Sequence, residues 1–235
     1  MIEHVLSDPE KYGAKKWLKE GRLFTLWPFF QDVPFLNPHY FGEKRMAANK
    51  NGTTQFISIG GDMYRFKVVV EAVERLLSFE NKNFKIIAIA EREELPKIPE
   101  RLAQYIKFKG SLDFAAMFAE IRAADFILLP LSYSVERHHT FLRGQVSGTN
   151  QLMLGFNKPC LLEEPFAKAY GLSEKNAVIY DSGRGLADAM RRAMEMGPEE
   201  YGQMQKNLQI LADEMYEKSL DNLKKVLQVA EGNNK

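Results

Sequence analysis

The chain has 235 residues, enough for one large domain or two small ones with a substantial buried core. Its 32 basic and 31 acidic residues leave a net charge of +1, which argues against a dedicated nucleic-acid surface because such surfaces carry a basic excess. The single cysteine, Cys160, cannot form an internal disulfide, and no apolar run approaches the roughly 20 residues that span a bilayer. We therefore expect a globular cytoplasmic protein without a signal peptide.

Residues 1–55 differ in character from the rest of the chain. Aromatic residues gather between positions 17 and 41, interleaved with Pro28, Pro34 and Pro38. This stretch is too aromatic for a free linker and too rich in proline for regular elements. Two interpretations stay open: an irregular segment packed against the following domain, or a joint to a further domain.

From residue 56 onward, short apolar runs alternate with segments of helical periodicity. The runs predict strands at 56–60, 84–89, 105–108, 126–130, 159–162 and 177–180. Phe66 to Leu77 and Phe114 to Ile121 repeat apolar residues at helical spacing, which predicts helices with one buried face. A last helical stripe runs from Met204 to Leu227, as one long helix or two with a break, before a frayed tail at 231–235.

This alternation predicts the fold class. Near-continuous apolar strands separated by amphipathic helices are typical of a parallel sheet covered on both faces. We expect residues 56–235 to form an α/β domain: a Rossmann-like, doubly wound parallel sheet of about six strands, with helices on both faces and a long C-terminal helical segment.

The first candidate binding loop follows the first expected strand. Gly60 and Gly61 let the backbone approach a ligand closely, and Arg65 and Lys67 follow as cations that neutralise a phosphate. The stretch is neither G-x-G-x-x-G nor a Walker loop, so the dinucleotide and NTPase fingerprints do not apply. A phosphate site and a plain structural turn both stay open here.

The second candidate loop is Ser147-Gly148-Thr149, just before a helix expected over 150–156. Backbone N–H groups and the positive end of the helix dipole make such a start an anion site. The simpler alternative is that Ser or Thr is an ordinary N-cap. Open parallel sheets bind ligands beyond the carboxyl ends of their strands, so we expect both loops to converge on a diphosphate at one edge.

In their order, these motifs resemble the nucleotide-binding half of GT-B-fold glycosyltransferases of the group-one family, over about residues 56–230. The matching segments are the strand, glycine, basic residue and lysine at 56–67, the passage from Phe108 to Pro130, and the S-G-T block at 147–159. The resemblance implies a UDP- or GDP-sugar donor and no further cofactor. The implied donor-binding residues are Gly60, Gly61, Arg65, Lys67, Ser147, Gly148 and Thr149.

The same resemblance implies an activity of polysaccharide biosynthesis. A hexose would be transferred to a glycan or lipid-linked acceptor with retention at the anomeric carbon. Many family members carry two glutamates before the G-x-P proline. Here Glu136 stands for the first, as the candidate catalytic residue, and Leu152 occupies the place of the second, so the sugar and ribose contacts of that pair are not carried over.

GT-B enzymes have two Rossmann-like halves, and we expect this chain to hold only the carboxy-terminal one. A second hypothesis follows from that expectation. The chain would be a non-autonomous nucleotide-binding or assembly module that docks an acceptor-domain partner through residues 17–41, and it would meet the membrane only peripherally, through that partner.

Two other chemistries fit the sequence less well. Gly144 to Gly148 is offset by one residue from a G-x-S-x-G nucleophile elbow, and all four histidines precede Ser147, whereas the hydrolase order places the histidine after the serine. Adjacent His138 and His139 diverge, so with Glu136 they make a weak metal site. No D-x-D occurs, which favours metal-independent departure of the nucleotide.

Overall fold

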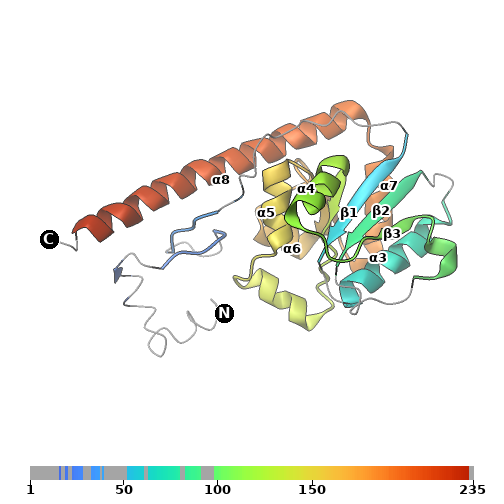
Figure 1. The fold of residues 1–235 in the computed structure, drawn as a ribbon, viewed down its shortest axis with the longest axis horizontal. Coiled ribbons are helices and arrows are strands. Elements are labelled where there is room, and N and C mark those ends of the chain that lie inside the picture. Colours follow the sequence, from blue (N-terminus) through green and yellow to red (C-terminus); the bar gives the residue numbers. More distant parts are fainter. Residues whose placement is uncertain are drawn as a thin grey trace.

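A six-stranded, wholly parallel sheet in the order β3-β2-β1-β4-β5-β6 forms the centre of the molecule (Figure 1). The structure is a computed structural model that describes residues 16, 19–20, 23–28, 33–37, 39, 52–60, 63–79, 83–90 and 98–232. Each expected strand is present with ends within two residues of its prediction. The strands are β1 Thr54–Ile59, β2 Phe84–Ile89, β3 Ile106–Phe108, β4 Phe126–Leu128, β5 Cys160–Glu163 and β6 Val178–Tyr180.

Helices cover both faces of this sheet, as expected. On one face lie α3 (Met63–Leu76) and α7 (Leu186–Glu195), and on the other α4 (Phe114–Ala123), α5 (Gly148–Phe156) and α6 (Glu164–Ala169). Neighbouring residues of each strand enter different cores: Phe56 packs toward α3 and α7, and Ile57 toward α4 and α5. The connections include three short 3-10 turns, η2 (Glu100–Leu102), η3 (Glu136–Leu142) and η4 (Gly183–Gly185).

Local signals fix where the site-forming helices begin and end. Asp113 caps α4, because its Oδ1 accepts a hydrogen bond from the Ala116 N–H at 2.8 Å. Asn157 ends α5 in the left-handed conformation, with φ of 52°. Each of these helices follows a loop after a strand of the parallel sheet, so both first turns lie at the carboxyl edge of the sheet.

The last helical stripe forms one helix without a break, α8 (Pro198–Gly232), about 52 Å long at 1.5 Å per residue. Its first part packs on the domain through buried Tyr201, Leu208 and Met215, and its second part runs on past the sheet (Figure 1). Glu231 and Gly232, which were expected in the frayed tail, are helical, and residues 233–235 lie outside the described residues. No helix in the described part of the chain combines the length and apolar character that crossing a membrane requires.

The described residues of the N-terminal segment pack against this domain. The Trp27 ring is 1% exposed and meets Tyr170 edge-on, with centroids 5.4 Å apart. The Asn37 N–H donates to Ser219 Oγ at 3.0 Å, so the segment also lies along the second part of α8 (Figure 1). Trp17, Phe29, Phe30, Tyr40 and Phe41 lie outside the described residues.

Candidate functional site

The order of the strands reverses between β1 and β4, and a hollow of about 520 Å³ opens beside their carboxyl ends. Such a switch point is where open α/β sheets bind ligands. We call it the switch-point hollow. Its lining residues come from β1, α3, α4, η3 and the start of α5: Ile59, Gly60, Arg65, Phe114, Met117, Phe118, Phe141, Gln145, Val146, Ser147, Gly148, Thr149 and Leu152.

The two loops singled out from the sequence meet at this hollow. Gly60 follows β1 with φ of +64°, a left-handed conformation that favours glycine, and its N–H donates to the Ile89 carbonyl at 2.8 Å. The Thr149 hydroxyl donates to the Ile59 carbonyl at 3.4 Å, which connects the start of α5 to the end of β1. Gly61 lies outside the described residues.

The start of α5 presents donors to the hollow. Ser147 occupies the N-cap position, yet its side chain makes no capping hydrogen bond. A Cβ built on Gly148 would meet no atom within 4 Å, so the space beside the first turn is open. Because the first N–H groups of a helix have no partner within it, this turn presents N–H donors and the Ser147 hydroxyl to an anion.

Arg65 and Lys67, expected to act together, line different hollows. Arg65 lines the switch-point hollow, and its guanidinium carbon lies 4.9 Å from the centre of the Phe141 ring. Residues two apart on a helix are turned by roughly 200° and do not share a side. The Lys67 side chain is accordingly 69% exposed, forms an ion pair with Glu71 at 3.8 Å, and does not join Ser147.

An aromatic side of α4 also lines the hollow, which the sequence analysis missed. Phe114, Met117 and Phe118 lie along it, and the Phe114 and Phe118 ring centroids are 5.9 Å apart. The periodicity placed these residues on a buried face, but only Ile121 is fully buried and Phe114 is 75% exposed. The available signal was two phenylalanines one turn apart at the beginning of a helix, next to the carboxyl edge.

A buried polar group stands behind the start of α5. Burial raises the pKa of the Tyr170 hydroxyl, and the nearby Ser147 backbone, Asn150 side chain and charge of Arg65 lower it in part. Tyr170 therefore stays a neutral phenol next to these groups. Since the same ring packs on Trp27, the N-terminal segment supports the hollow from behind.

Glu136, His138 and His139 do not line the switch-point hollow of the described structure. Glu136 is exposed on η3, away from the residues that line the switch-point hollow, so its position lends no support to a catalytic role. His138 is buried, and its Nδ1 accepts a hydrogen bond from the Ser132 N–H at 2.9 Å. The described residues contain no group of three His, Cys, Asp or Glu side chains placed to hold a metal ion.

Two further hollows lie beyond the first turn of α3. One, of about 660 Å³ beside α3 and η4, is lined by Arg75, which pairs with Asp188, by Glu74, which pairs with Arg101, and by Arg184. The other, of about 520 Å³, lies at the ends of β5 and β6 and is called the second hollow. It is lined by Tyr64, Lys67, Val68, Glu71, Ser132, Ser134, Val135, Glu163, Ser182 and Arg184.

Comparison with known proteins shows a shared fold. No protein-family model and no curated protein matches the sequence. Among solved structures, TarM is similar at 11% identity over 94% of this chain and 46% of its own, with a TM-score of 0.57. A UDP-forming trehalose-phosphate synthase from Burkholderia xenovorans in complex with glucose-6-phosphate is similar at 18% identity over 75% and 44%, with a TM-score of 0.51.

A third structure, described as trehalose-6-phosphate from E. coli bound with UDP-2-fluoro glucose, is similar at 13% identity over 74% and 44% of the two chains, with a TM-score of 0.52. These likenesses confirm the expected Rossmann-like fold, a parallel sheet with helices on both faces. The chain spans less than half the length of each of these three structures.

Proposed function

We propose that the chain is the donor-binding part of a glycosyltransferase and that the switch-point hollow binds a nucleoside diphosphate sugar. The observation that carries the proposal is the meeting of Gly60, Arg65 and the start of α5 in one hollow. Close backbone approach, a guanidinium and a helix start are together what a diphosphate requires. The solved structure bound with UDP-2-fluoro glucose shares this fold, which supports the choice of ligand.

The aromatic side of α4 supports binding of the base end of the donor. The exposed Phe114 ring lies beside Phe118, and both line the same hollow as the start of α5. Stacking on an aromatic ring contributes roughly 1–3 kcal/mol per base and tolerates different bases. We therefore place the base against Phe114 and the diphosphate between Arg65 and Ser147.

In the proposed reaction the bond between the anomeric carbon and the diphosphate oxygen breaks, and the hexose passes to a glycan or lipid-linked acceptor. Negative charge grows on the leaving diphosphate, where Arg65 and the α5 N–H groups stabilise it in place of a metal ion. Retention at the anomeric carbon rests on the family resemblance alone. Product stereochemistry read by NMR tests retention, and unchanged turnover in EDTA tests metal independence.

The binding step is tested by calorimetry of the 235-residue chain with UDP, GDP and their hexose conjugates. We expect saturable binding that Arg65→Ala weakens roughly 10- to 100-fold, since a hydrogen bond to a charged group contributes about 1.5–3 kcal/mol. Lys168→Ala is the matched control, because that lysine is 80% exposed on α6 and lines neither hollow. Absence of binding across the whole panel would overturn the proposal.

A second candidate function, a module completed by a partner domain, is favoured by apolar residues on the second part of α8 and the N-terminal segment. Leu223 is 40% and Leu227 54% exposed on α8, and Phe24 and Leu26 are each 44% exposed. In this proposal an acceptor-binding partner covers these side chains, so the lone chain binds donor without transferring sugar. Rapid transfer by the isolated chain would reject it.

A further inference from the structure

The second hollow contains a buried carboxylate whose hydrogen bonding is incomplete. Glu163 ends β5 and is only 4% exposed, and its Oε1 accepts a hydrogen bond from the Tyr133 N–H at 3.2 Å. Its Oε2 is buried and has no hydrogen-bond partner in the described structure. Leaving such an acceptor unsatisfied is unfavourable, so a ligand that donates a hydrogen bond here would be stabilised.

Burial affects the charge of this group as well. It raises the pKa of Glu163, the hydrogen bond from the Tyr133 N–H and the nearby Ser132 side chain lower it in part, and the charge on Asp181 raises it further. A hydroxyl group from a ligand would solvate the carboxylate that burial disfavours. Ser132, Ser134 and Ser182 line the same hollow, and the Ser132 and Ser134 hydroxyls are hydrogen-bonded to each other at 2.9 Å.

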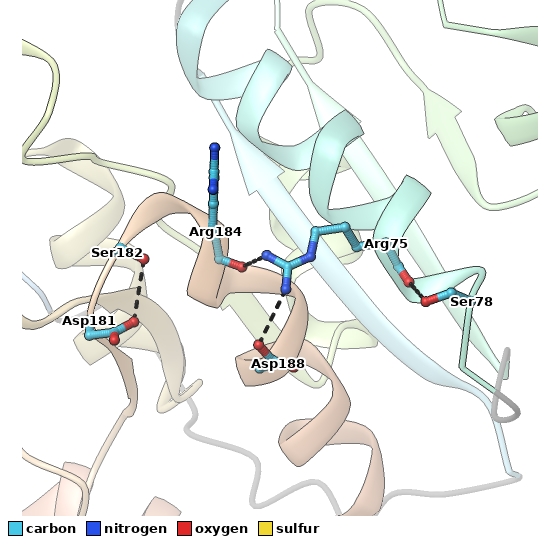
Figure 2. Close-up of polar contacts among 6 residues, drawn as sticks. All are labelled: Arg75, Ser78, Asp181, Ser182, Arg184 and Asp188. Atoms are coloured by element: carbon cyan, nitrogen blue, oxygen red, sulfur yellow. Dashed lines mark hydrogen bonds and ion pairs between the residues drawn. The ribbon is translucent and has the colours of Figure 1, made fainter.

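Arg184 supplies a cation at the rim of the second hollow. Its backbone carbonyl accepts a hydrogen bond from Arg75, which also lies 3.7 Å from Asp188, so the η4 turn is held in place (Figure 2). Its own guanidinium projects away from that cluster and makes no hydrogen bond or ion pair within the described residues (Figure 2). Lys67 lines the same hollow and has only an exposed pair with Glu71, which is weak in water.

The arrangement separates a cationic rim from an acidic floor. A bare phosphate would pair with the two cations at the rim, but Glu163 would repel it. A neutral sugar would donate a hydrogen bond to Glu163, but it would leave the two cations without an anionic partner. A nucleobase finds little room for stacking, because the Arg137 guanidinium already lies 4.6 Å from the Tyr64 ring centre. The volume, about 520 Å³, lies in the range of small-molecule sites.

We propose that the second hollow binds a hydroxylated anion of monosaccharide size, with its anionic group on Arg184 and Lys67 and a hydroxyl on Glu163. Sugar phosphates and uronic acids share this chemistry. The site lies on the other side of the first turn of α3 from the switch-point hollow, so it goes beyond the proposed donor site and stands independently of it.

Calorimetry of the 235-residue chain at pH 7 tests the proposal with glucose 6-phosphate, glucuronic acid, glucose and inorganic phosphate. We expect one or both of the hydroxylated anions to bind at least tenfold more tightly than glucose or inorganic phosphate, and the first two arms tell a phosphate from a carboxylate. Arg184→Ala should weaken that binding tenfold or more. Its side chain is exposed, so folding is preserved, and Lys168→Ala is the control.

Glu163→Gln provides a second readout, the ratio of affinities for the preferred ligand and inorganic phosphate. That ratio should fall several-fold, because the variant lacks the negative charge that accepts the hydrogen bond of the ligand hydroxyl. Arg184 and Lys67, which bind the anionic group, are unchanged. Equal affinity of the wild-type chain for all four ligands, or an Arg184→Ala variant that binds like wild type, would overturn the proposal. UDP titrations separate the two sites, because Arg184→Ala should leave UDP binding unchanged. A wild-type chain that binds a hydroxylated anion but not UDP would contradict only the donor-site proposal.

Discussion

Lys158, in the turn between α5 and β5, is a buried lysine whose proton should make stability depend on pH. It is 2% exposed, and its Nζ donates hydrogen bonds to the carbonyls of Arg122 at 3.0 Å and Ala124 at 2.6 Å. It thereby satisfies the carboxyl end of α4, the helix that carries Phe114 and Phe118. Burial lowers the pKa of Lys158 from 10.5 to about 8, and the charge on Asp125 offsets part of the effect.

The magnitude follows from the two pKa values. The unfolded chain keeps the Lys158 proton up to about pH 10.5, whereas the folded protein releases it above about pH 8. Between these values the unfolded state binds more protons, so the free energy of unfolding rises with pH. At about 1.4 kcal/mol per pKa unit, the Lys158 contribution rises by about 3 kcal/mol over this window.

The assay is urea denaturation of wild type and Lys158→Met at pH 7.5, 8.5, 9.5 and 10.5, followed by circular dichroism. Methionine keeps the side chain long and removes the titration. The difference in unfolding free energy, wild type minus variant, should grow by about 3 kcal/mol from pH 8 to 10.5. Buried tyrosines titrate alike in both proteins and cancel. A difference that stays constant across this range, like the one expected for the exposed control Lys168→Met, would refute the reasoning.

Four further outcomes are expected. Phe114→Ala should weaken UDP binding roughly 10- to 100-fold in calorimetry without lowering the melting temperature, since the ring is 75% exposed. Lys67→Ala should weaken UDP binding far less than Arg65→Ala, and equal losses would contradict the assignment of the two side chains to different hollows. Gly60→Ala should reduce the free energy of unfolding by about 1–2 kcal/mol in urea titrations through its positive φ alone, because its Cβ would meet no atom within 4 Å. Trp27→Ala should reduce the same free energy by about 3–5 kcal/mol, and an unchanged denaturation midpoint would show that the N-terminal segment does not stabilise the domain.

The sheet was predictable because its signals are local. Phe84 to Ile89 is apolar at every position except the exposed Lys85, and it forms β2 with the predicted ends. The six runs, in order and separated by helical periodicity, require a doubly wound parallel sheet because crossovers are right-handed. The loops at 60 and 147–149 were likewise found from residue type alone. The backbone freedom of glycine and the N–H groups of a helix start are local properties that do not depend on residues distant in sequence.

The residues of the site were harder to predict, because lining a hollow depends on the rotation of a helix. Arg65 and Lys67 look equivalent in sequence, yet the rotation of α3 points them into different hollows. Phe114 continues the apolar pattern of Ile121, yet it is 75% exposed whereas Ile121 is fully buried. Periodicity gives the side of a helix that faces inward and does not give the point where the core ends.

The sequence by itself therefore determined the order of strands and helices, the fold class and the two loops that meet at the switch point, because each depends on periodicity or on the backbone freedom of single residues. Only the tertiary structure decided which cation joins Ser147, that α4 adds an aromatic wall, and that Glu163 ends β5 with an unsatisfied oxygen. Those features arise where segments distant in sequence pack together, and the free energy of burial that fixes them depends on neighbours that no local pattern specifies.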